Sequence, residues 1–175
     1  MLTKKDKKWL NHLSDQHKVK IVPFNPKVKE IFEKQKKEIQ SILGENILVI
    51  HKGASNLGIS GKGEIDVYVP VGSDEFSYFL EKLIQEYGKP GSLYASERAR
   101  FNRKLENTDI EIFLINKDSS DWTRAIVFEE YLKIHPKELK AYEKLKEEAN
   151  GLSMREYYRR KIEFINEIIA EASKK

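Results

Sequence analysis

The segment that most constrains this chain is a glycine-rich stretch followed directly by alternating acidic and β-branched residues. It reads HKGASNLGISGKGEIDVYV and covers residues 51–69. Alternation with a period of two is typical of a strand with one buried face, so Glu64 and Asp66 project from one face and Ile65 from the other. The segment therefore predicts a tight, glycine-containing turn that leads into a strand with two neighbouring carboxylates.

The turn itself contains four glycines within eleven residues, Gly53, Gly58, Gly61 and Gly63. Glycine lets the backbone turn sharply and approach a ligand closely, and successive N–H groups can then cradle phosphate oxygens. The spacing does not fit a Walker A loop, because Gly63 stands where that motif requires Ser or Thr. Phosphate binding through another geometry stays open, beside the alternative that the glycines serve only to turn the chain.

A second pair of alternating acids lies in the later run TDIEIFLIN, residues 108–116. Neighbouring carboxylates repel each other unless a cation neutralises them, and Mg²⁺ prefers oxygen ligands. If the two strands are neighbours, the first pair and one acid of the second hold one or two Mg²⁺ or Mn²⁺ ions. The candidate metal ligands are Glu64, Asp66, Asp109 and Glu111. The alternative is that these acids are only the solvent-facing halves of amphipathic strands.

The pattern along the chain predicts an α+β fold, a mixed β-sheet with helices packed on it. Three helices are expected before the hairpin, at residues 3–17, 27–43 and 73–88. Strands are expected at residues 47–51, 64–71, 92–105 and 108–116, with a turn at Glu106-Asn107, and helices follow to the C-terminus. The predicted parts are a charged helical extension (1–20), an α/β core (21–118) and a C-terminal helical segment packed on the core (119–175).

Composition narrows the class of protein. The 32 Lys and Arg exceed the 28 Asp and Glu only slightly, which is a weak argument for nucleic-acid binding. Because cysteine is absent, disulfides, thiolate zinc sites and a Cys nucleophile are excluded. No apolar run is long enough to span a membrane, and the N-terminus does not resemble a secretion signal, so we expect a soluble, cytoplasmic protein.

Four further residues are candidates for phosphate binding. His51 precedes Gly53 and is expected to orient the turn or contact phosphate, or to be simply structural. Lys62 lies beside the acidic strand, where an ammonium can neutralise triphosphate oxygens. Arg98 and Arg100 share one face of the expected strand and suit triphosphate or a nucleic-acid backbone, unless they only protect an exposed edge.

The site resembles that of polymerase-beta-like nucleotidyltransferases, which carry a glycine element, an acid-x-acid strand and a third acid on a later strand. In this chain the corresponding elements are Gly53-Ala54-Ser55, Glu64-Ile65-Asp66 and Asp109-Ile110-Glu111. This resemblance implies a nucleotidyltransferase-like sheet that binds nucleotide and metal.

A more specific resemblance, from Val22 to near the end, is to the GrpB family (UPF0157) of that superfamily. Four blocks stand in the family's order: VPFNPKVKEIFEKQKKEI, HKGASNLGISGKGEIDV, DWTRAIVFEEYLKIHPKELKAYEKLK and YYRRKIEFI. The chain departs from the family pattern in three ways. Ala54 replaces the usual serine, Gly58 and Gly63 replace prolines or shift the register in a loop one residue shorter, and Glu64 replaces an apolar residue. The last departure restores the acid-x-acid pair, and Asp66 is the firmer correspondence.

The resemblance implies transfer of a nucleoside monophosphate from an NTP to a hydroxyl-bearing small molecule, protein or RNA. Gly53 and Ser55 are expected to hold the triphosphate, and Asp66 or Glu111 to help deprotonate the acceptor. With Glu64, these two acids form the expected catalytic set. Two alternatives remain: a nucleotide- or phosphate-binding module without turnover, and an RNA-binding accessory protein that uses the basic segment 94–104.

Overall fold

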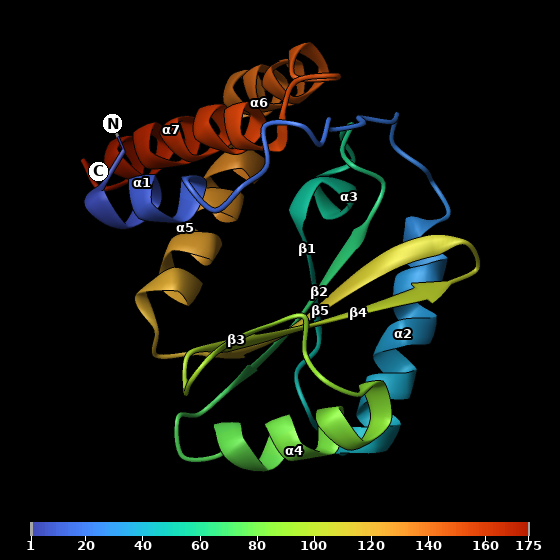
Figure 1. The fold of residues 1–175 in the computed structure, drawn as a ribbon. Coiled ribbons are helices and arrows are strands. Elements are labelled where there is room, and N and C mark those ends of the chain that lie inside the picture. The colour runs from blue at the N-terminus through green and yellow to red at the C-terminus, as the bar shows by residue number, and fades with distance from the viewer. Residues whose placement is uncertain (1, 175) are drawn as a thin grey trace. The chain divides into compact units, whose positions relative to one another are not determined.

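The computed structural model describes residues 2–174; Met1 and Lys175, the outermost residues of the predicted extension and tail, lie outside the described residues. Within this range the chain forms seven helices and one mixed five-stranded sheet, shown in Figure 1. The predicted α+β class is therefore confirmed. The chain divides into two compact units, a sheet unit of residues 25–58 and 63–123, and a helical unit of residues up to Phe24, 59–62 and from Arg124 onward.

The sheet unit contains all five strands in the order β1-β2-β5-β4-β3. Their bounds are β1 Ile50–Lys52, β2 Ile65–Val71, β3 Ser92–Tyr94, β4 Arg98–Leu105 and β5 Thr108–Asn116. The two acid-bearing strands, β2 and β5, are parallel neighbours, whereas the other three pairs are antiparallel. In the parallel pair Asp66 lies opposite Glu111, so the two carboxylates belong to the same face.

One face of the sheet carries the main core, together with α2 (Val28–Leu43) and α4 (Phe76–Tyr87), which Figure 1 shows beside the strands. Ile65, Val67 and Val69 of β2 are fully buried in this core, as the alternation predicted. The opposite face therefore bears Asp66, and it is the face on which a site can form.

Two element boundaries differ from the prediction for reasons visible in the hydrogen bonds. β1 begins at Ile50 and not at residue 47, because the N–H of Ile47 donates to the carbonyl of Gly44, and its carbonyl accepts from Gln40. The first helix, α1 (Lys4–Leu10), ends well before residue 17, because Asn11, His12 and Leu13 form turns.

The glycine-rich stretch is also more regular than expected, because it contains a short helix, α3 (Gly53–Leu57). Gly58 ends this helix with φ of 71°, a left-handed conformation that glycine adopts at little cost. The turn of the β4–β5 hairpin agrees with the prediction, and its residues Glu106 and Asn107 both have positive φ. The strand expected over residues 92–105 is instead divided into β3 and β4, because residues 95–97 form a turn.

The helical unit consists of α1, α6 (Pro136–Glu148) and α7 (Met154–Ala172), and α5 (Ser120–Ile134) contributes residues to both units. Helix α1 lies along α7 (Figure 1). The rings of Trp9 and Tyr158 meet there edge to face, at 5.1 Å between centroids. Over the described residues no helix combines the length and the apolar character that crossing a membrane requires.

Candidate metal and nucleotide site

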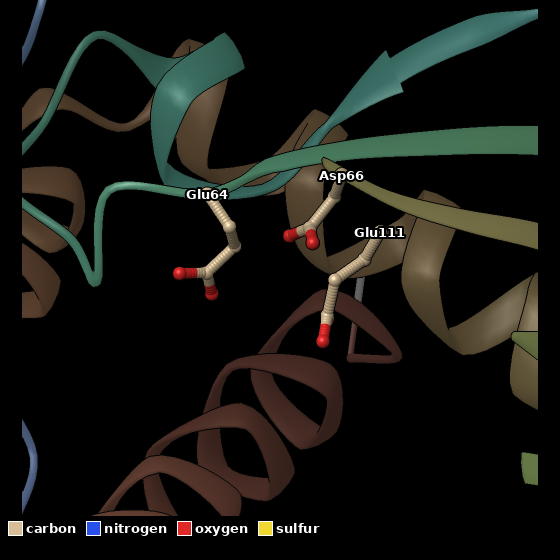
Figure 2. A group of neighbouring side chains, drawn as sticks. All are labelled: Glu64, Asp66 and Glu111. Carbon is tan, nitrogen blue, oxygen red and sulfur yellow. The ribbon is translucent and has the colours of Figure 1, made fainter. Parts of the chain in front are cut away.

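Three carboxylates converge on the open face of the sheet. Glu64 immediately precedes β2, Asp66 lies on β2 and Glu111 lies on β5, and one carboxylate oxygen from each lies within 4.8 Å of the others. Figure 2 shows the three side chains extending to the same side of the two strands. All three are half-buried. Oxygen donors at this spacing match the preference of Mg²⁺ and Mn²⁺ for hard ligands.

Gly53, at the junction of β1 and α3, forms part of the same site. Its φ is +79°, and a Cβ atom built there would lie 2.3 Å from Oδ2 of Asp66. The carboxylate thus fills the space that a side chain at position 53 would need. This close approach and the all-oxygen donor set together fit a divalent cation bound at Glu64, Asp66 and Glu111.

The two candidates for the third acid differ in their surroundings. Glu111 joins Glu64 and Asp66, as the register of β2 and β5 requires. Asp109 lies toward the start of β5 with a side chain that is 74% exposed, and its carboxylate is 3.7 Å from the ammonium of Lys104. Geometry therefore brings Glu111 into the cluster and leaves Asp109 at the surface.

The two arginines of β4 have different neighbours although they share a face. Arg100 donates a hydrogen bond from Nη1 to Oε1 of Glu111 at 3.0 Å, which places its guanidinium beside the carboxylate cluster. Arg98 lies opposite Tyr94 of β3, with its guanidinium 5.0 Å from the ring centroid of that tyrosine. The Nε atoms of both arginines are buried without a hydrogen-bond partner.

His51 and Ser55 contact each other, with Nε2 of the histidine 2.9 Å from the serine Oγ. The imidazole stacks on Phe32 of α2 at 4.8 Å between centroids, and His51 lies opposite Val67, so it faces the core side of the sheet. Burial lowers the pKa of His51 from 6.5 to about 4. The ring is therefore neutral at pH 7, which suits positioning of Ser55 and provides no positive charge.

Comparison with known proteins identifies the family. The chain matches the GrpB protein family over residues 18–171, which is most of its length. This chain belongs to the GrpB family. The resemblance inferred from four ordered sequence blocks is thus confirmed.

Individual GrpB relatives agree with this assignment. The chain is 28% identical over 166 residues to the glutamate-rich protein GrpB of Alkalihalophilus pseudofirmus, covering 86% of this chain and 94% of that protein. It is 27% identical over 141 residues to the UPF0157 protein YqkA of Bacillus subtilis, covering 78% of this chain but only 41% of YqkA. The crystal structure of GrpB from Enterococcus faecalis superposes with a TM-score of 0.72 at 25% identity, covering 88% of this chain and 97% of that one.

Lys62, the last of the predicted phosphate-binding residues, belongs to the helical unit of this GrpB chain. There its ammonium lies 5.7 Å from the ring centroid of Tyr158. The sheet unit thus holds the acids, Gly53, His51, Ser55 and both arginines.

Sequence reasoning missed one charged residue at the site, Lys52. It lies directly opposite Asp66 in the β1–β2 pair, yet only 4% of its surface is exposed. Its ammonium is 5.7 Å from the ring centroid of Trp122. The alternation of Ile50, His51 and Lys52 could have revealed this residue, but the predicted strand ended at residue 51, one residue before Lys52.

An aromatic cluster beside the acids was also missed. The ring of Tyr68, two residues after Asp66 on β2, stacks on Phe113 at 4.7 Å and lies 5.9 Å from Trp122 between centroids. Tyr68 and Phe113 follow Asp66 and Glu111 by two residues on their strands, so the period of two placed them on the acid-bearing face. The aromatic cluster thus gives the site an apolar side.

Proposed function

We propose that this GrpB-family chain is a nucleotidyltransferase that binds Mg²⁺ or Mn²⁺ and transfers a nucleoside monophosphate from an NTP to a hydroxyl-bearing acceptor. The observation that carries the proposal is the convergence of Glu64, Asp66 and Glu111 from two parallel strands, next to a glycine whose missing side chain makes room for Asp66. The superfamily resemblance of the same residues supports it.

In this mechanism Glu64, Asp66 and Glu111 supply oxygen ligands and hold the reacting groups on the open face of the sheet. A divalent cation held by these three residues would supply Lewis-acid chemistry, which would polarise the phosphate and stabilise the charge that develops on the leaving pyrophosphate. Asp66 or Glu111 accepts the proton of the acceptor hydroxyl. The hydroxyl oxygen then bonds to the α-phosphorus as the bond to pyrophosphate breaks.

The glycine turn positions the triphosphate in this proposal. Gly53 allows the ligand to approach the backbone, and Ser55 offers a hydroxyl that the neutral imidazole of His51 orients at 2.9 Å. Arg100 is the cation nearest the third acid, at 3.0 Å from Glu111, and is suited to pair with phosphate oxygens. Arg98, which shares a face of β4 with Arg100, remains a candidate for a further contact with the triphosphate.

A phosphate-binding module without turnover is the second candidate function. The observation that favours it is the ion pair between Arg100 and Glu111, which neutralises one of the three carboxylates that metal chemistry requires. Under this alternative the chain binds nucleotide or another phosphate ester and releases it unchanged.

Measurement of pyrophosphate release separates these functions. The full chain is incubated with each NTP, with Mg²⁺ or Mn²⁺, and with pooled small-molecule, protein and RNA acceptors. We expect release that Asp66→Asn abolishes and that Asp109→Asn, a matched loss of charge on an exposed acid, leaves intact. NTP binding without pyrophosphate in any pool would establish the second candidate, and absence of both binding and release would overturn both.

A further inference from the structure

Two fixed positive charges flank the carboxylate cluster. Arg100 forms the 3.0 Å ion pair with Glu111 from the neighbouring strand β4. Lys52 lies opposite Asp66 across the β1–β2 pair, and side chains at such positions share a face with Cβ atoms roughly 5 Å apart. Lys52 is only 4% exposed, so its side chain is enclosed by protein beside Asp66 and screened little by solvent.

The balance of charge determines what such a site can bind. Three carboxylates face two basic side chains, so the cluster keeps an excess of only one negative charge. A bare divalent ion meets attraction from the acids and repulsion from both Lys52 and Arg100. A polyphosphate changes this balance, because its oxygens pair with both basic side chains and also offer further ligands to the metal.

We propose that Lys52 and Arg100 are built-in counter-ions that make divalent-cation binding at Glu64, Asp66 and Glu111 depend on a bound polyphosphate. The inference rests on the proposed function and adds a binding order to it. When a polyphosphate is bound, Arg100 exchanges Glu111 for a phosphate oxygen, which releases the third carboxylate for the metal. Lys52 stays in place and neutralises phosphate charge next to Asp66. Neither residue needs to touch the reacting atoms.

The size of the expected effect follows from charge separation. A unit positive charge a few ångströms from a divalent ion, screened as in a partly buried protein site, weakens binding by roughly ten-fold or more. Removal of either cation should therefore tighten binding of the metal alone by about that factor. Since coupling between two ligands is reciprocal, the same change should reduce how much polyphosphate and metal assist each other.

The test measures Mn²⁺ affinity of the full chain by electron paramagnetic resonance of free Mn²⁺. Titrations are made alone, with inorganic tripolyphosphate, and with a non-hydrolysable NTP. We expect weak binding alone and much tighter binding with either anion. Lys52→Met and Arg100→Met should tighten binding alone roughly ten-fold and diminish the gain from the anion. Arg100→Lys, which keeps the charge, and Lys104→Met, an exposed cation on the same strand, should behave as the wild type.

The outcomes distinguish this inference from the proposed function. If Asp66→Asn removes Mn²⁺ binding but the two methionine variants bind Mn²⁺ no more tightly than the wild type, the counter-ion role is wrong and the metal site stands. If the wild type binds no Mn²⁺ under any condition, or Asp66→Asn changes nothing, both are wrong. Should the buried Lys52→Met variant fail to fold, as circular dichroism would reveal, the pair Arg100→Met and Arg100→Lys decides the matter.

Discussion

The Oδ2 atom of Asp66 occupies the position next to Gly53 at which a side chain would begin, because a Cβ atom there would lie 2.3 Å away. The same glycine has φ of +79°, a region that L-residues with side chains adopt only at a cost. Gly53 is therefore required twice, once for the turn from β1 into α3 and once for the placement of the Asp66 carboxylate.

Gly53→Ala should weaken both the fold and the site. We expect a loss of about 1–2 kcal/mol in the free energy of unfolding from the left-handed backbone. Because Asp66 must also move, Mn²⁺ affinity in the presence of a non-hydrolysable NTP should fall by roughly ten-fold or more. Gly58→Ala is the matched control, since Gly58 has φ of +71° and open space around it. It should lose similar stability and retain Mn²⁺ binding; equal Mn²⁺ affinity in the two variants would contradict the clash.

The identity of the third acid gives a second prediction. Glu111→Gln removes a charged ligand and should lower Mn²⁺ affinity with bound NTP analogue at least ten-fold, and abolish any pyrophosphate release. Asp109→Asn removes the same charge from an exposed position that pairs with Lys104, and should leave both unchanged. Isothermal titration with Mn²⁺ measures the difference. Equal losses in the two variants would indicate a general charge effect and contradict the geometric assignment.

Local sequence patterns predicted which residues of one strand share a face. They did not predict which residue of the neighbouring strand lies beside each of them. The period of two placed Glu64 with Asp66, and Asp109 with Glu111. Selecting Glu111 needs the offset between β2 and β5, which pairs it with Asp66. That offset depends on packing of the two strands in the core and on the connection between them, and no local pattern encodes it.

Short elements were the other source of error. α3 has only five residues, too few to show the apolar periodicity of a helix, so its residues were expected to be loop. β1 has three residues, and its last, Lys52, lies just beyond the β-branched run 47–51 on which the predicted strand rested. The predicted site therefore omitted one charged residue, Lys52, because the predicted strand ended one residue too early.

Acid should destabilise the protein through His51. Burial holds the pKa of its imidazole at about 4, below the unfolded value of 6.5, so the unfolded chain binds the proton more readily between these values. Stability from this group is therefore full above pH 6.5 and is lost as pH falls toward 4. Between pH 7.5 and 5 the loss should be about 2 kcal/mol.

Urea unfolding of the wild type and of His51→Gln at pH 7.5 and pH 5 measures this contribution. The variant lacks the titrating ring, so its stability should change less between the two pH values. The imidazole nitrogen shifts in NMR should independently show a neutral ring in the folded wild type at pH 5. A charged ring at that pH, or an identical pH dependence in the variant, would contradict the assignment.

Acid should also reduce the stability that Glu156 contributes in the first turn of α7. Hydrogen bonds from Arg159 and Arg160 lower the pKa of Glu156 to about 2. A carboxylate with a lowered pKa stabilises the fold above its unfolded value of 4.5, and this stability is lost as pH falls toward 2. Because solvent screens these ion pairs, Glu156→Gln should lower the free energy of unfolding by only about 0.5–1 kcal/mol at pH 7 and by nearly nothing at pH 2.

Thermal unfolding of the wild type and the variant at both pH values measures this difference, with the exposed Glu167→Gln as the control. A loss of stability that persists at pH 2 would show that the Glu156 side chain acts through packing and not through charge.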